Sequence, residues 1–449
     1  VIGEDKRYLQ LFQQLYNNNP TDFQLATISN LLFMALGSEQ LQQPFVSTLA
    51  AHFKYLSDQA FSDLPSPLAP NPQRSLHVQE KPLLVVTSSD LRQHPVGRFW
   101  LPIARKLRSH FRVISVAGLP RDRDPIRTEL QQLSDEWWPL EASDVVQTAA
   151  RIRDLAPAFL LDLGGHTADN HPVFLTQRLA TVQASYLGFY GPTYAACCDW
   201  WIVDHALMRW IDCSYPGAES LWPLPGSSLC YVPELHGLPD PDVSIYREPN
   251  HPVYGSFNHS RKLTRASQKR FGAVLSANPD AVLKFRSHSF QDPAVRRYFL
   301  QHFSAAGIAP HQLQPLPFAP SAMDAMCDFG GIHLHLDSYP VSGTTTTLDS
   351  LAMGIPVLTC PTRYYAGAIS AAILEHVGLA DHVCSDQGQL PSHAIWLSER
   401  YRSVSARMSL AQKVRKSPIC DQHQMPRMFV QQLQKMLRRS ISSSDVTIS

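Results

Sequence analysis

Three features are missing from this sequence, and each absence excludes a class of protein. The eight cysteines are scattered and include no Cys-x-x-Cys pair, so neither a zinc site nor a disulfide framework is indicated. No apolar run approaches the roughly 20 residues that a membrane helix needs. Lysine and arginine number 39 against 38 aspartates and glutamates, so no basic surface for nucleic acid is indicated. We therefore expect a cytoplasmic protein with reduced thiols that binds neither nucleic acid nor membrane.

The length predicts more than one domain. With 449 residues, of which 44% are hydrophobic and 17% charged, the chain is long enough for two α/β domains and an extension. Its first residues do not begin with Met and are not typical of a signal peptide. Such a start is compatible with a piece of a longer chain.

Residues 1–62 are predicted to form a helical extension. Apolar residues recur at helical spacing from Tyr8 to Tyr16 and from Leu25 to Met34, and a third helix is expected at 39–61. The helices are compatible with the end of a repeat array, although no period decides this. Prolines at positions 65, 67, 70 and 72 make residues 63–80 a linker.

Strands and helices then alternate in two series. The first predicts strands at 82–87, 111–117, 158–163, 182–187 and 200–203, and helices at 98–110, 142–155 and 174–180. Residues 205–250 are rich in proline and are interpreted as an irregular interdomain segment. The second series predicts strands at 253–257, 281–286, 332–336 and 356–359, helices at 264–276, 293–306, 345–353 and 366–377, and further helices to about 439.

This alternation predicts an α/β protein of the GT-B type, with two doubly wound parallel-sheet domains. We assign residues 81–250 to the first Rossmann-like domain. Residues 251–439 form the second Rossmann-like domain, which carries the candidate ligand site described next. The Ser-rich residues 440–449 are predicted to be a disordered tail.

A run of threonines marks the candidate ligand site. It lies where the strand at 332–336 leads into a helix, and it comprises Gly343, Thr344, Thr345, Thr346 and Thr347. The first N–H groups of a helix lack partners within it, and the helix dipole is positive there, so this junction suits a diphosphate. Asp349, one turn further on, is placed to accept hydrogen bonds from ribose hydroxyls. The alternative is that one threonine caps the helix and the others bind no ligand.

Two histidines raise the question of a metal. His333 and His335 alternate on the strand before the threonine run, so both side chains are expected on one face. No carboxylate or cysteine partner follows at a fixed spacing, and we expect no metal site.

Several motifs in a fixed order make this chain resemble the catalytic region of the O-linked N-acetylglucosamine transferase and SPINDLY family, over about residues 82–383. The Gly-His-Thr and Gly-Thr-Thr-Thr-Thr versions are similar to SPINDLY and bacterial members. The motifs are Ser-Ser-Asp-Leu-Arg-Gln-His-Pro-Val-Gly at 88–97, Leu-Asp-Leu-Gly-Gly-His-Thr at 161–167, Val-Gln-Ala-Ser-Tyr-Leu-Gly at 182–188, Trp-Ile-Val-Asp at 201–204, Gly-Ser-Phe-Asn at 255–258 with Lys262, and the segment 336–349.

The resemblance implies an inverting transfer, without a metal, from a nucleotide-diphosphate sugar to a protein Ser or Thr hydroxyl. The co-substrate it implies is UDP-N-acetylglucosamine, and the partner is an acceptor protein or peptide. Lys262 matches the lysine that stabilises the departing diphosphate. His94 matches a histidine of the acceptor region that is a candidate general base.

Further residues are carried over from the same motifs. Thr345 and Thr346 match the threonines that cradle the phosphates, Asp349 matches the ribose-binding carboxylate, and Asn258 joins the donor set. His166 matches a position that faces the cleft and binds sugar. Gly165, Gly188 and Asp90 are assigned to the same sugar and acceptor cleft.

The chain departs from the family where the nucleobase binds. Ala325 stands where relatives carry a base-stacking His, Ser342 replaces an Asn, and His333 replaces an Asp. The base is therefore open between UDP and GDP, and SPINDLY-type transfer of fucose from GDP-fucose is an alternative. Others are glucosylation of Asn, an epimerase of the same fold, and an interaction protein that has lost catalysis.

Overall fold

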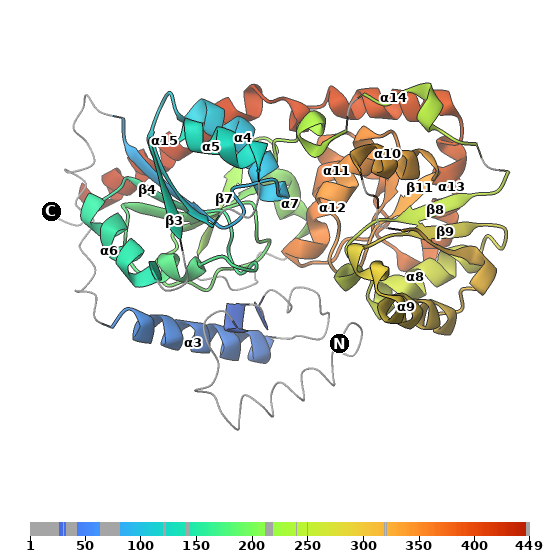
Figure 1. Ribbon diagram of the computed structural model, residues 1–449, viewed down its shortest axis with the longest axis horizontal. Helices are drawn as coiled ribbons and strands as arrows, with labels where there is room; N and C mark the ends of the chain where they lie inside the picture. The colour runs from blue at the N-terminus through green and yellow to red at the C-terminus, as the bar shows by residue number, and fades with distance from the viewer. Residues whose placement is uncertain are drawn as a thin grey trace.

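Two lobes lie side by side, each built on a parallel sheet (Figure 1). The computed structural model describes residues 27–29, 31–32, 43–62, 81–119, 123–140, 144–211, 219–238, 240–248, 250–317, 319 and 321–445. The helix predicted at Tyr8–Tyr16 and the linker at 63–80 fall outside these ranges. Within them, no helix is both long and apolar enough to cross a membrane.

The first lobe contains a seven-stranded sheet in the order β3-β2-β1-β4-β5-β6-β7, with all pairs parallel. Its inner strand β1 reads Leu-Leu-Val-Val-Thr-Ser and is buried along almost its whole length, as expected of a strand covered on both faces. The strands are β1 (Leu83–Ser88), β2 (Arg112–Gly118), β3 (Glu136–Leu140), β4 (Phe159–Asp162), β5 (Val182–Ser185), β6 (Trp200–Asp204) and β7 (Ser220–Leu224), and the helices are α4 (Pro95–Leu107), α5 (Pro125–Leu133), α6 (Val145–Leu155) and α7 (His205–Trp210).

The second lobe contains a five-stranded parallel sheet in the order β10-β9-β8-β11-β12. The strands are β8 (Val253–Ser256), β9 (Val282–Phe285), β10 (Leu313–Pro315), β11 (Leu334–Leu336) and β12 (Val357–Leu358). The helices are α8 (Arg265–Ser276), α9 (Pro293–Ala305), α10 (Ala322–Gly330), α11 (Thr345–Ala352), α12 (Tyr365–His376), α13 (Leu390–Arg400) and α14 (Val404–Arg415).

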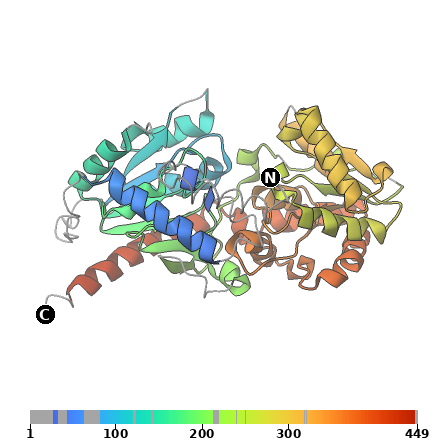
Figure 2. The ribbon, with the colours of Figure 1, turned by 90° about the horizontal axis from the view of Figure 1, so that it is seen from below.

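Helix α3 (Gln43–Ala60) lies across the first lobe, as Figure 2 shows. Its apolar residues Val46, Leu49 and Phe53 are buried in one cluster with Val173 and Phe174 of the first lobe. The described part of the predicted helical extension is thus docked on the first sheet domain, with its apolar face covered.

The last helix corrects two of the predicted boundaries. Helix α15 (Gln424–Asp445) leaves the second lobe and packs on the first, where Phe429 lies against Trp100 and Tyr186 with ring centroids 6.1 and 4.9 Å away. Residues 424–439 therefore do not belong to the second domain. The predicted disordered tail is also wrong for residues 440–445, which continue this helix.

Two segments differ from their predicted structure. Residues 205–250 were expected to be irregular but contain α7 and strand β7. The helix predicted at 174–180 is a short 3₁₀ turn, η3 (Pro172–Thr176), because Thr181 and Val182 are already hydrogen-bonded to Pro157 and Ala158 beside β4.

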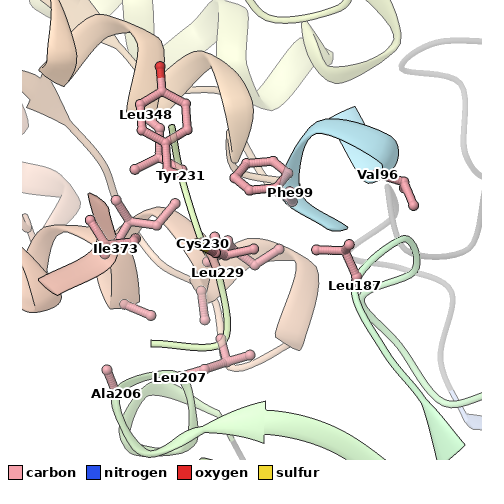
Figure 3. Close-up of a cluster of buried hydrophobic side chains, with 14 of the residues drawn as sticks. Val96, Phe99, Leu187, Ala206, Leu207, Leu229, Cys230, Tyr231, Leu348 and Ile373 are labelled. Carbon is pink, nitrogen blue, oxygen red and sulfur yellow. The ribbon is translucent and has the colours of Figure 1, made fainter. Parts of the chain in front are cut away.

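The lobes are joined twice, because the chain crosses once before β8 and once between α14 and α15. The two crossings touch, since the backbone N–H of Tyr231 donates to the carbonyl of Ile419 at 2.8 Å. Figure 3 shows the buried cluster at the first crossing, in which Leu229, Cys230 and Tyr231 lie among side chains of both lobes.

Candidate active site

The loop between β11 and α11 is held by one carboxylate, Asp337. Its Oδ1 accepts hydrogen bonds from the backbone N–H groups of Ser338 and Gly343, each at 2.8 Å, and from Asn258 Nδ2 at 3.2 Å. Thr359 donates to Oδ2 at 2.8 Å. Four donors on one carboxylate fix the path by which the chain enters α11.

The glycine and threonines of this loop have different tasks. A Cβ on Gly343 would lie 2.5 Å from Thr347 Oγ1, so the loop requires glycine there. Residues 344–346 are half-buried, and Thr346 donates to Asn258 Oδ1 at 2.7 Å. Thr347 is fully buried, and its hydroxyl lies 2.8 Å from that of Ser370 on α12. The prediction that the Thr347 hydroxyl serves the donor is therefore wrong, because this hydroxyl packs the loop onto α12.

Lys262 lies in the turn η6 (Ser260–Lys262), 80 residues before Ser342 in sequence. The fold places it next to residues 342–347, which we call the threonine loop. Its Nζ donates to the carbonyl of Ser342 at 2.7 Å. Burial lowers the pKa of the ammonium, and the negative charge of Asp337 opposes that shift. A cation thus lies at the positive end of α11, an arrangement suited to an anion. Its binding of phosphate stays a prediction.

Asp349, one turn into α11, is contacted from the first crossing between the lobes. Tyr231 donates its hydroxyl to Asp349 Oδ1 at 2.6 Å, and His236 Nδ1 lies 3.6 Å from the same oxygen. Burial raises the pKa of Asp349 to about 7, while the Tyr231 hydrogen bond and the charge of Arg98 act against that rise. Sequence reasoning missed all three neighbours, because they come from α4 and from a segment that was interpreted as irregular.

On the first lobe, Asp90 and His94 lie together in the loop that leads into α4. Asp90 Oδ1 accepts from Arg92 Nη2 at 3.0 Å, and Asp90 Oδ2 accepts from Asn170 Nδ2 at 3.1 Å. His94 Nδ1 lies 3.4 Å from the backbone N of Val96 and 3.6 Å from Asp90 Oδ1.

These two contacts of His94 require opposite tautomers, because Nδ1 accepts from Val96 but donates to Asp90. Burial lowers the pKa of His94, although Asp90 opposes that shift, so the ring is neutral at neutral pH. Only the tautomer that donates from Nδ1 to Asp90 leaves Nε2 free to take a proton.

Asn170 is a further residue that the motifs did not single out. Its Oδ1 accepts from the backbone N of Ser89 at 2.8 Å and from Ser88 Oγ at 3.1 Å, and its Nδ2 donates to Asp90 and Thr167. It therefore joins the loop after β1 to the loop after β4.

His166 does not face a ligand site, so that prediction is wrong. The residue is fully buried, with Nδ1 3.0 Å from Ser29 Oγ and Nε2 2.7 Å from the carbonyl of Thr193. Burial lowers its pKa to about 4. Because Ser29 belongs to the helical extension, His166 connects that extension to the first lobe.

Close packing explains why the two positions assigned to the same cleft, 165 and 188, are glycines. Gly165 has a positive φ of 53°, and a Cβ on it would lie 2.4 Å from Phe189 Cβ. A Cβ on Gly188 would lie 2.1 Å from the carbonyl oxygen of Leu163. Both shape the loops beneath the site, and a contact with sugar stays a prediction.

The histidines of β11 have protein partners. His335 Nδ1 lies 2.7 Å from Ser350 Oγ, and His333 Nδ1 accepts from the backbone N of Val253 at 3.0 Å. In the part of the chain that the structure describes, no group of three or more His, Cys, Asp or Glu side chains is placed to hold a metal ion. Ala325 is half-buried on α10.

The fold and the site together define a class, a GT-B protein with a threonine loop and a half-buried lysine in its second lobe. The structure of a mutant of the Thermobaculum terrenum O-GlcNAc transferase matches 100% of this chain and 83% of its own with a TM-score of 0.81, at 23% identity. This likeness confirms the predicted fold.

Comparison of sequences finds relatives that share the predicted resemblance. The chain is 29% identical over 371 residues to the probable UDP-N-acetylglucosamine–peptide N-acetylglucosaminyltransferase SPINDLY of Solanum lycopersicum. The aligned region covers 81% of this chain and 39% of that protein. The protein of the same description from Oryza sativa is 28% identical over 369 residues, 81% of this chain and 40% of its own length. No family profile matches. The resemblance to the O-linked N-acetylglucosamine transferase and SPINDLY family is thus confirmed, and the chain spans about two fifths of the length of these relatives.

Proposed function

We propose that this chain is a glycosyltransferase that moves a sugar from a nucleotide-diphosphate donor to a Ser or Thr hydroxyl of a protein, with inversion at the anomeric carbon. The donor we propose is UDP-N-acetylglucosamine, because the relatives are named for that reaction. The observation that carries the proposal is the position of Lys262 Nζ, 2.7 Å from the carbonyl of Ser342, directly before the first turn of α11.

This placement suits the chemistry of the departing group. As the bond between the anomeric carbon and the diphosphate breaks, negative charge grows on the terminal phosphate oxygens. A fixed ammonium and the unpaired N–H groups at a helix start stabilise that charge without rearranging. Since these groups already supply positive charge, we propose that the transfer requires no metal.

His94 and Asp90 are the residues that we propose act on the acceptor hydroxyl. The acceptor oxygen attacks the anomeric carbon and gives up its proton, for which we propose His94 Nε2 as the base. For this role Asp90, whose Oδ1 lies 3.6 Å from Nδ1, would replace the backbone N–H of Val96 as the partner of Nδ1 and so set the required tautomer.

The nucleobase is the part of the donor that the site supports least, because Ala325 replaces a stacking histidine of the family. A thermal-shift panel of UDP, GDP, UDP-N-acetylglucosamine, UDP-glucose and GDP-fucose addresses it, since a ligand of the folded state raises the melting temperature. A shift with uridine compounds supports the proposal. A shift with guanosine compounds alone replaces it with fucose transfer, and no shift at all favours an interaction protein.

The transfer itself is tested with Lys262→Ala, assayed with a protein acceptor in the presence of a metal chelator. We expect transfer to fall by roughly ten- to a thousand-fold, because the leaving group loses its cation. The control is Lys269→Ala, an exposed lysine of α8, which should keep the wild-type rate. If Lys262→Ala retains more than about a tenth of the activity, the proposed role of this lysine is wrong.

A further inference from the structure

One oxygen of Asp349 is engaged by the protein, and the other is left open. Tyr231 Oη lies 2.6 Å and His236 Nδ1 3.6 Å from Oδ1. No described residue donates a hydrogen bond to Oδ2, and the Asp349 side chain retains 20% of its exposure. The carboxylate is therefore anchored through one oxygen and partly open to solvent through the rest of the group.

The two anchoring side chains are buried far more deeply than the carboxylate. Tyr231 is fully buried, and the side chain of His236 has no exposed surface. Their rings lie 4.6 Å apart, and Phe99 of α4 packs on both, at 6.0 Å from Tyr231 and 5.1 Å from His236. Figure 3 shows Tyr231 and Phe99 in the cluster to which α11 contributes Leu348.

His236 is unusual because neither ring nitrogen has a hydrogen-bond partner among the described residues, although both atoms are buried. Buried polar atoms are normally paired, and an unpaired one costs free energy. The carboxylate of Asp349 lies 3.6 Å from Nδ1. A small shift of the acid toward His236 would satisfy both groups, so the imidazole is placed to hold the carboxylate when a ligand draws on it.

We propose that Tyr231 and His236 are positioning residues that hold Asp349 through Oδ1 and direct Oδ2 at the hydroxyls of a ribose, so that donor recognition depends on these hydroxyls. The inference rests on the proposed function, which makes this site a nucleotide site. It goes further by assigning the ribose requirement to two residues of the crossing segment. Because these residues belong to neither sheet, the same contact ties nucleotide binding to the junction of the lobes.

The competing explanation is that both residues only pack the two lobes together. The readout must therefore be one that packing alone leaves unchanged. The ratio of affinities for a ribonucleotide and for its 2′,3′-dideoxy form is such a readout, because it reports only on the hydroxyls. A general loss of structure weakens both ligands alike.

The experiment measures this ratio by calorimetry for the whole chain, with UDP or GDP, whichever the wild type binds, and its dideoxy form. We expect the wild type to bind the ribonucleotide at least tenfold more tightly. In Tyr231→Phe and in His236→Asn the ratio should fall to threefold or less, with dideoxy binding unchanged within twofold. Tyr254→Phe and His382→Asn, which alter a buried tyrosine and a buried histidine of the second lobe, are matched controls and should keep the wild-type ratio.

The outcomes separate the inference from the function on which it rests. A wild type that binds neither nucleotide defeats the proposed function and the inference with it. A wild type that binds and discriminates, with variants that discriminate equally well, overturns the inference alone. Should Tyr231→Phe fail to fold, the affinity ratio of His236→Asn decides the inference, because His236 lies beside the same oxygen of Asp349. Should both fail, Asp349→Asn decides, since a ratio unchanged in that variant excludes any ribose contact by Asp349.

Discussion

At the scale of single residues, the threonine loop shows how little freedom a site of this kind allows. Asp337 accepts from two backbone N–H groups, and Asn258 connects it to Thr346. Gly343 lies inside this network, with Thr347 Oγ1 2.5 Å from where its Cβ would be. The half-buried threonines keep their positions because the residues beneath them are fixed.

Gly343→Ala should therefore destabilise the protein by about 1–3 kcal/mol, since the added methyl group overpacks a buried site. Unfolding in urea measures the change, and the nucleotide-induced thermal shift should shrink with it. Gly226→Ala is the control, because the nearest atom to its added Cβ would be Met428 Cε at 3.7 Å, and it should be neutral or stabilising by up to about 1 kcal/mol. Equal stabilities of the two variants would contradict the role given to Gly343.

Residues of the site could be predicted from sequence where they lie within motifs. Lys262, Thr346 and Asp349 were singled out in this way, and the structure gathers them around α11. Tyr231 could not be found, because it lies 118 residues from Asp349 in a proline-rich segment without periodicity. The prediction that His166 faces the cleft was wrong, because a histidine after a Gly-Gly pair looks the same in sequence whether it faces a ligand or is buried.

At the scale of elements, the strands that were missed share a physical feature. Strands β3, β7 and β10 each contain a proline, at positions 139, 223 and 315, and all three lie at the edge of a sheet. Proline lacks the N–H that a central strand needs on both sides, so it is tolerated at an edge. The inner strands, none of which contains a proline, were predicted within one or two residues of their ends.

The attachment of the helical extension should depend on pH through His166. Its pKa is about 4 in the folded protein and about 6.5 in an unfolded chain. A lowered pKa contributes stability above pH 6.5 that is lost as the pH falls through 4, here up to about 3 kcal/mol.

The measurement is urea unfolding of the wild type and His166→Gln at pH 7.5 and 4.5. The wild type should lose more stability than the variant on acidification, because only the wild type has this buried imidazole. His423→Gln, an exposed position, should follow the wild type. A variant with the full acid loss would show that other groups cause it.

At the scale of the whole molecule, the C-terminal helix completes the first lobe. Phe429 packs against Trp100 and Tyr186, and Trp222 Nε1 donates to Gln432 Oε1 at 3.2 Å. The stability of the first lobe therefore depends on residues that follow the second lobe in sequence.

Phe429→Ala should destabilise the first lobe by about 3–5 kcal/mol, the usual cost of removing a buried ring. Hydrogen exchange should report the loss in the amides of β1 and β5 rather than in those of β8 and β11. Gln431→Ala, on the exposed side of the same helix, should change stability by no more than about 0.5 kcal/mol. Faster exchange confined to the second lobe would contradict this packing.

The contact between Tyr231 N and Ile419 O, at 2.8 Å, has a mechanical consequence. Two lobes joined by a single chain segment can rotate relative to each other in any direction. Two adjacent connecting segments restrict this motion mainly to a rotation about the line that passes through both. Any opening of the lobes should then pivot near these two crossings. Tyr231 lies at this point and donates to Asp349, so the carboxylate should move less than loops far from the crossings.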